Sequence, residues 1–97
     1  MSIDDRRRHI DEIDAELLRL LNRRLELVRQ IGRAKADSGA SIVDPDREAA
    51  IVERLLAANV GPLDADSVRR IFETIIAEMR RLERAYAAAE DSDNEAR

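Results

Sequence analysis

Three cations interrupt the longest apolar pattern in the sequence. From Ile3 to Lys35, positions spaced alternately three and four residues apart are mostly aliphatic, yet Arg7, Arg24 and Lys35 belong to the same series. Burying a cation is costly unless an anion meets it. Such cations either reach solvent along the apolar surface, pair with acidic residues of a neighbouring helix, or bind an anionic ligand. Because three of them share one face, the ligand hypothesis gains weight.

The spacing of these cations limits which of them can serve one ligand. In a helix, Arg24 and Lys35 lie about 16 Å apart along the axis, so two extended side chains could reach one small anion between them. Arg7 lies about 25 Å from Arg24 and cannot join them within one straight helix. An antiparallel copy, related by a twofold axis near Leu17 and Leu18, would bring its Arg7 beside this gap. Two symmetric sites would result, each drawing on both chains.

The stretch "DPDRE", residues 44–48, combines a helix start with two candidate site residues. Asp44 is a favoured N-cap, and Pro45 stands where no amide donor is needed. Capping does not explain the next two charges. Arg47 falls on the apolar side of the predicted helix, and Glu48 falls on the adjacent flank.

Glu83 is a candidate site residue on a third helical segment. It follows Ile76 by seven residues and Met79 by four, which places it on or beside the apolar face. The ordinary explanation is an ion pair with Arg80 or Arg84, which contributes little where it is exposed. The alternative is a carboxyl group that faces the same site as the cations.

These residues require three helices to position them, and the sequence predicts no strands. The two Pro residues lie at apparent breaks between helical patterns. We expect one domain over residues 1–90 and a polar, disordered tail over 91–97. The expected helices run from about Asp4 to Asp37, from just after Asp44 to about residues 59–62, and from about Ala65, capped by Asp64, to Ala89. A short loop over residues 38–41 joins the first two.

The first predicted helix is too long for the two shorter ones to cover. It would hold about 34 residues and extend about 50 Å. A chain of this size also buries only about 60–65% of its unfolded surface, which favours oligomerisation. A second copy of the chain is the simplest partner for this helix.

The composition excludes several other kinds of site. The chain has no Cys and a single His, which excludes disulfides, thiolate chemistry and a metal site built from His. Its net charge of -4 argues against nucleic acid as a partner. No stretch has the run of about 20 apolar residues that a membrane span needs, and the N-terminus lacks a signal-peptide core. We therefore expect a cytoplasmic protein.

Four segments, in order and at matching spacing, resemble the all-helical chorismate mutases, the small bacterial type often fused to other shikimate-pathway enzymes. They are "IDEIDAELLRLLNRR", "IGRAK", "DPDRE" and "LDADSVRRIFETII", within about residues 7–83. The resemblance implies an all-α fold of three helices per chain, one long and two shorter, in an intertwined homodimer with two composite active sites. It also implies rearrangement of chorismate to prephenate, without a metal or an organic cofactor.

The resemblance implies a role for each cation. Arg24, together with Arg7 from the partner chain, would bind the two carboxylates of chorismate, and Arg47 would face the substrate near a carboxylate. Lys35 would contact a carboxylate and the ether oxygen. Such chemistry needs fixed charges because the substrate must be held in its reactive conformer while negative charge develops on the ether oxygen.

The resemblance also implies roles for the acidic residues. Asp44 and Glu48 would hold the hydroxyl end of the ring. Glu83 occupies a position that donates a second hydrogen bond to the ether oxygen, where many bacterial members have Gln. A carboxylate cannot donate, so Glu83 must be protonated to act there. Met79 also departs from members that place a small hydroxyl residue there to help bind a carboxylate.

Three alternatives remain open at this point. An isochorismate–pyruvate lyase would share the fold and the cationic pocket, although Asp44 and Glu48 favour the mutase. A binding or regulatory helical domain without turnover could partner another pathway enzyme, although a pure interaction module has no need of buried cations. The third alternative is a plain helical dimerisation module.

Overall fold

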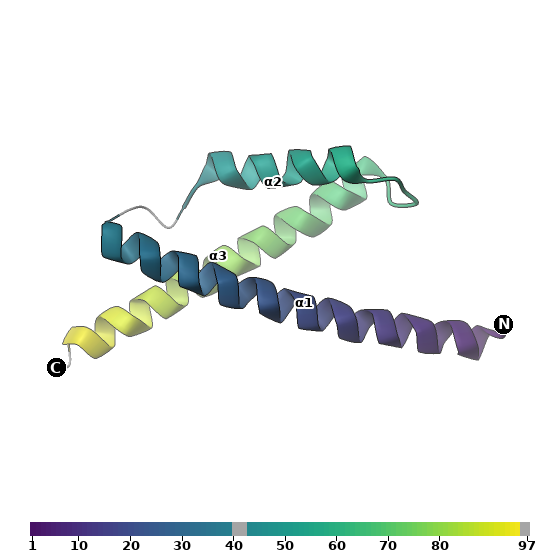
Figure 1. Ribbon diagram of the computed structural model, residues 1–97, viewed down its shortest axis with the longest axis horizontal. Coiled ribbons are helices and arrows are strands. Elements are labelled where there is room, and N and C mark those ends of the chain that lie inside the picture. Colours follow the sequence, from purple (N-terminus) through teal and green to yellow (C-terminus); the bar gives the residue numbers. More distant parts are fainter. Residues whose placement is uncertain (40–42, 96–97) are drawn as a thin grey trace.

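The computed structural model describes residues 1–39 and 43–95. It contains α1 (Ile3–Ser38), α2 (Pro45–Ala58) and α3 (Ala65–Glu95), in that order, and the described residues hold no strand (Figure 1). The all-α prediction with three helices is therefore confirmed. Ala40 and Ser41 of the predicted loop lie outside the described residues.

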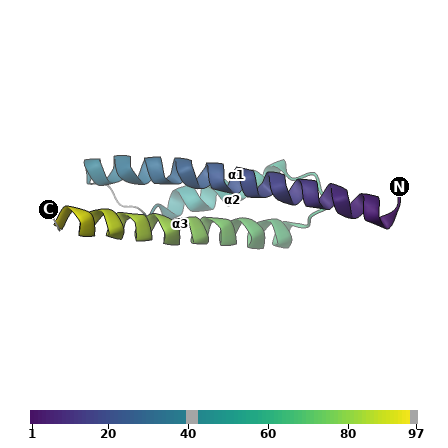
Figure 2. The same ribbon diagram turned by 90° about the horizontal axis from the view of Figure 1, so that it is seen from below.

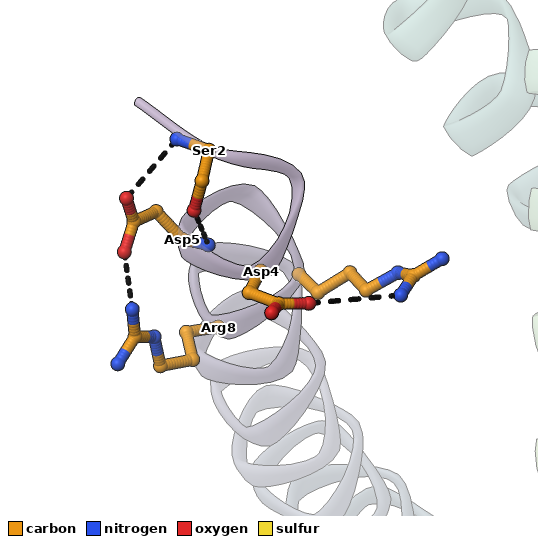
Figure 3. A network of polar contacts seen from close by, with 5 residues as sticks. Ser2, Asp4, Asp5 and Arg8 are labelled. Atoms are coloured by element: carbon orange, nitrogen blue, oxygen red, sulfur yellow. Dashed lines mark hydrogen bonds and ion pairs between the residues drawn. The ribbon is translucent and has the colours of Figure 1, made fainter.

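Polar side chains fix the start of every helix. Ser2 caps α1 and exchanges hydrogen bonds with Asp5, because its Oγ accepts from the Asp5 amide at 3.1 Å and its own amide donates to Asp5 Oδ2 at 3.1 Å (Figure 3). Asp44 Oδ1 accepts from the Arg47 amide at 3.1 Å, and Asp64 Oδ1 accepts from the Ser67 amide at 2.7 Å. The predicted starts of α2 and α3 are confirmed.

The helix ends differ more from the prediction. α1 ends at Ser38 and is followed by its C-cap Gly39, whose φ of 75° is left-handed, as expected for a glycine in this position. α3 continues to Glu95, so the predicted helix end at Ala89 was too early. The sequence after Ala89 contains neither Gly nor Pro to stop a helix. The division into a domain over 1–90 and a tail over 91–97 stays a prediction.

α3 is the helix that holds the other two. It packs against both α1 and α2, whereas within the described residues no Cα atom of α1 comes within 8 Å of a Cα atom of α2 (Figures 1 and 2). Near the C-terminal ends of α1 and α3, the Arg29 guanidinium lies 3.9 Å from the centre of the Tyr86 ring, and Arg33 Nε lies 3.3 Å from Glu90 Oε1. These contacts keep the second half of α1 beside α3.

The apolar face of α1 is not covered within one chain. No residue of α1 is buried, and its N-terminal part projects beyond the other helices (Figures 1 and 2). The radius of gyration is 17.3 Å, whereas a compact chain of this length has about 13 Å. Large apolar side chains of α1 that are 43–65% exposed are Ile3, Ile10, Ile13, Leu17, Leu18, Leu20, Leu27 and Ile31.

The buried core of the chain is correspondingly small. It consists of Val52 from α2 and of Val68, Ile76 and Met79 from α3, each at most 7% exposed. Among the helices of the described ranges, none has the length and apolar character needed to cross a membrane. The molecule thus presents long charged and apolar helix faces around a limited core.

Candidate active site

A pocket of about 150 Å³ lies where the second half of α1, the start of α2 and the middle of α3 meet. Its lining includes six of the seven charged residues that the sequence singled out. They are Arg24 and Lys35 of α1, Asp44, Arg47 and Glu48 at the start of α2, and Glu83 of α3. The structure thus brings together residues that lie up to 59 positions apart in the chain.

Helical spacing explains why α1 offers its cations to this pocket. Arg24, Val28, Ile31 and Lys35 follow one another at intervals of four, three and four residues, so they share one face of the helix. This is the C-terminal half of the apolar series that Arg7, Arg24 and Lys35 interrupt. Val28 and Ile31 separate the two charges with apolar surface.

Arg24 lies beside a second cation. It is partly buried, and burial together with the positive charge of Arg47 lowers the pKa of its guanidinium. Within residues 1–39 and 43–95, no carboxylate lies within ion-pair distance of Arg24. Two neighbouring guanidinium groups without a carboxylate between them form a place that favours an anion.

The start of α2 is fixed by its cap. Asp44 accepts the Arg47 amide through Oδ1, and the backbone carbonyl of Asp44 accepts the Glu48 amide at 3.0 Å. The cap sets the direction in which Arg47 and Glu48 leave the first turn. Asp44 itself stays exposed, so its carboxylate can meet a ligand while it caps the helix.

Glu83 is the most buried polar residue among those described. It is 9% exposed, and its Oε1 has no hydrogen-bond partner among the described residues. Burial raises the pKa of the Glu83 carboxyl, the positive charge of Lys35 opposes this, and the negative charge of Glu48 adds to it. A raised pKa favours the protonated form, which can donate a hydrogen bond.

Arg80 is a pocket residue that the sequence did not identify. Its Nη1 lies 2.5 Å from Glu48 Oε1, and both side chains are partly buried. The ordinary explanation considered for Glu83 was an ion pair with Arg80 or Arg84, and among the described contacts Arg80 pairs with Glu48. Arg80 follows Ile76 by four residues, which puts it on the pocket side of α3. That spacing was a usable signal, but its partner on α2 depends on how the helices cross.

Arg7 is the predicted site residue that lies elsewhere. It stands near the projecting end of α1, where its Nη1 lies 3.7 Å from Asp4 Oδ1, in the region that Figure 3 shows. Its side chain is 73% exposed, so it is available to another molecule. Within one chain, the pocket therefore lacks the third arginine of the predicted set.

The pocket combines four cations with three acidic groups, and one of the cations, Arg80, is paired with Glu48. Arg24, Arg47 and Lys35 offer positive charge, whereas Asp44 and Glu48 offer acceptors and Glu83 offers a carboxyl group of raised pKa. In the described ranges, no group of three or more His, Cys, Asp or Glu residues is arranged to hold a metal ion. Such a lining suits a small molecule that carries both carboxylate and hydroxyl groups.

Comparison with known proteins gives one family. Residues 6–84 match the family described as "Chorismate mutase type II". The chain is 42% identical over 83 residues to a bifunctional chorismate mutase/prephenate dehydratase of Neisseria gonorrhoeae, covering 86% of the chain and 22% of that protein. It is 41% identical over 64 residues to an intracellular chorismate mutase of Mycolicibacterium smegmatis, covering 66% of the chain and 61% of that protein.

Solved structures agree with this match. A structure of chorismate mutase from Thermus thermophilus superposes with a TM-score of 0.83 at 35% identity, covering 84% of the chain and 93% of the other. A second form of the Thermus thermophilus protein gives a TM-score of 0.79. The chain spans less than a quarter of the length of the bifunctional relatives from Neisseria gonorrhoeae and Aquifex aeolicus, at 22% and 24%.

Proposed function

The chain belongs to the chorismate mutase type II family, and we propose that it rearranges chorismate to prephenate, a step in the biosynthesis of aromatic amino acids. The observation that carries this proposal is the pocket in which Arg24 and Arg47 lie together while Glu83 carries a raised pKa. The reaction breaks one C–O bond and forms one C–C bond within the same molecule. No group leaves, so the protein supplies position and charge.

The cations position the substrate. Chorismate has two carboxylates and reacts only when its side chain folds over the ring. Arg24 binds one carboxylate, with Arg47 close to it, and Arg7 of the partner subunit binds the other. Because the protein holds both ends of chorismate in the reactive conformer, the bound substrate does not have to reach that conformer by chance, and the entropic part of the barrier is lower than in solution.

Lys35 and protonated Glu83 stabilise the transition state. As the C–O bond breaks, negative charge grows on the ether oxygen. The Lys35 ammonium and the Glu83 carboxyl donate hydrogen bonds to that oxygen from α1 and α3. Donors that are fixed before the reaction begins stabilise such charge without reorganisation, most effectively where water is excluded. Val28, Ile76 and Met79 provide the apolar surface beside them.

Asp44 and Glu48 bind the hydroxyl end of the ring. Both are acceptors at the start of α2, and Arg80 holds Glu48 through its 2.5 Å contact. A hydroxyl that donates to a carboxylate forms a charge-assisted hydrogen bond, which is stronger than one between neutral groups. This end of the pocket distinguishes chorismate from ligands that lack the hydroxyl.

The working unit is an antiparallel homodimer. The exposed apolar surface of α1 supports this proposal, because eight large apolar side chains of this helix are 43–65% exposed. A second copy would cover that face and bring its Arg7 to the pocket of the first copy. The intertwined arrangement and the composite site both follow from this pairing.

Subunit mixing tests the composite site. Arg7→Met and Arg24→Met should each be nearly inactive alone. When the two variants are refolded together in equal amounts, about half of the dimers contain one chain of each, and one of the two sites in such a dimer is intact. The mixture should therefore recover about a quarter of the wild-type activity. Turnover of chorismate by the mixture measures the recovery. If the mixture is no more active than its parents, Arg7 and Arg24 do not meet across subunits.

Asp44→Asn separates capping from binding. Asn caps helices about as well as Asp, so the melting temperature should stay nearly unchanged. Loss of the charged acceptor should lower kcat/KM about tenfold, as expected when one hydrogen bond to a charged group is weakened. A fall in melting temperature that accounts for the lost activity would assign Asp44 to capping alone.

The direct test of the function follows chorismate absorbance with purified protein across pH, with isochorismate in parallel. Conversion of chorismate to prephenate supports the proposal. Release of pyruvate from isochorismate without turnover of chorismate would replace the mutase by the lyase. A folded dimer that turns over neither substrate would favour a regulatory or structural domain.

A further inference from the structure

Gly32 stands directly against the acidic residue at the reacting end of the pocket. It is partly buried in α1, three residues before Lys35, and faces α3. A Cβ atom at residue 32 would lie 2.8 Å from Glu83 Oε1, 3.1 Å from its Cγ and 3.3 Å from its Cδ. Non-bonded carbon atoms prefer about 3.5–4.0 Å, so none of these three atoms could stay in place.

The backbone does not explain a glycine at this position. Gly39 and Gly61 have positive φ angles, but Gly32 does not, so its backbone lies within the range of ordinary residues. In the middle of a helix, glycine costs about 1 kcal/mol relative to alanine. The missing side chain must therefore provide something else, and the nearest atoms in that space belong to Glu83.

We propose that Gly32 is a positioning residue: its lack of a side chain creates the space that holds the Glu83 carboxyl group in the pocket beside Lys35. This inference rests on the proposed function in assigning Glu83 to the ether oxygen. Glu83 Oε1 is buried without a hydrogen-bond partner among the described residues, so no hydrogen bond there fixes this oxygen. It is also the atom closest to the space that a side chain at residue 32 would fill.

A methyl group at residue 32 should move the carboxyl group and disturb the fold little. The affected atoms are the far end of a flexible side chain, which can rotate away from α1. Rotation would move the carboxyl group away from the charged residues that face this part of the pocket, which are Lys35 of α1, Glu48 of α2 and Arg80 of α3. The donor would then no longer be aimed at the ether oxygen.

Gly32→Ala should lower kcat about 10- to 100-fold with a much smaller change in KM, since the misplacement affects a transition-state contact. The melting temperature should stay equal or rise, because alanine favours the helix. In a Glu83→Ala background, adding Gly32→Ala should change kcat little, since no carboxyl group is left to displace. Ala34→Gly, on an exposed position of the same helix, is the control for helix propensity and should leave kcat unchanged.

Carbon NMR of the labelled Glu side chains provides a readout that needs no turnover. In Gly32→Ala, the Glu83 carboxyl should titrate closer to the ordinary pKa of glutamate than in wild type, because it has left the buried position. An unchanged titration and an unchanged kcat would overturn the inference, as would an equal loss of kcat with and without Glu83. An inactive wild type would contradict the proposed function, while the titration would still decide the role of Gly32.

Discussion

Arg24→Met should lower kcat/KM for chorismate by about 10²- to 10³-fold, the usual effect of removing one fixed donor from a charged transition state. Arg24 is the partly buried cation that lies beside Arg47 and has no carboxylate partner among the described residues. Met keeps the apolar stem of the side chain and removes only the charge and its donors. The substrate carboxylate would then have lost its main partner.

The same substitution should leave the protein at least as stable. Burial and the charge of Arg47 lower the pKa of Arg24, which means that the folded state disfavours its positive charge. Removing this charge relieves the repulsion, so the melting temperature of the ligand-free protein should be unchanged or higher. A binding residue that is unfavourable without its ligand is expected in a site built for an anion.

Arg23→Met is the matched control for this prediction. Arg23 is the neighbouring residue, lies 3.2 Å from Glu26 Oε2 and has a side chain that is 58% exposed. Its loss should alter neither kcat/KM nor stability by much. Equal activity of the two variants, or a loss of activity in Arg24→Met that follows from unfolding, would remove Arg24 from the binding site.

The local features of the fold were predictable because they depend on nearby residues. Asp44 and Asp64 have the residue type and the following sequence that begin a helix, and both cap as expected. The end of α3 was harder to predict, because the residues after Ala89 include no strong helix-stopping signal and are all compatible with a helix. Helix ends without Gly or Pro carry little information in the sequence.

Part of the lining of the candidate pocket was predictable, namely the positions at which a charged residue interrupts the apolar pattern of a helix. Arg24, Lys35 and Glu83 were found because each interrupts an apolar face, and all three line the pocket. Arg80 and Gly32 were not found, because their importance depends on what the neighbouring helix places opposite them. A single sequence gives the face of each helix but not the crossing that pairs Arg80 with Glu48.

Glu83→Gln should remove the pH dependence of turnover. In wild type, kcat should fall as pH rises through the raised pKa of Glu83, by about tenfold per pH unit, because only the protonated carboxyl group donates to the ether oxygen. Gln donates at every pH, so its profile should be flat and its kcat should exceed that of wild type in the alkaline range. Glu73→Gln, on an exposed position of α3, should keep the wild-type profile.

Stability provides an independent check on the sign of this shift. A raised pKa means that the folded state binds the Glu83 proton more tightly than the unfolded state. The resulting stabilisation is complete below the ordinary pKa of glutamate and is lost as pH rises through the raised pKa in the folded protein. As pH rises through that range, the melting temperature of wild type should therefore fall relative to that of Glu83→Gln. Thermal unfolding of both proteins at matched pH measures this difference. If wild type gained stability instead, or if both variants kept the same falling rate profile, Glu83 would be ionised in the pocket and could not donate to the ether oxygen.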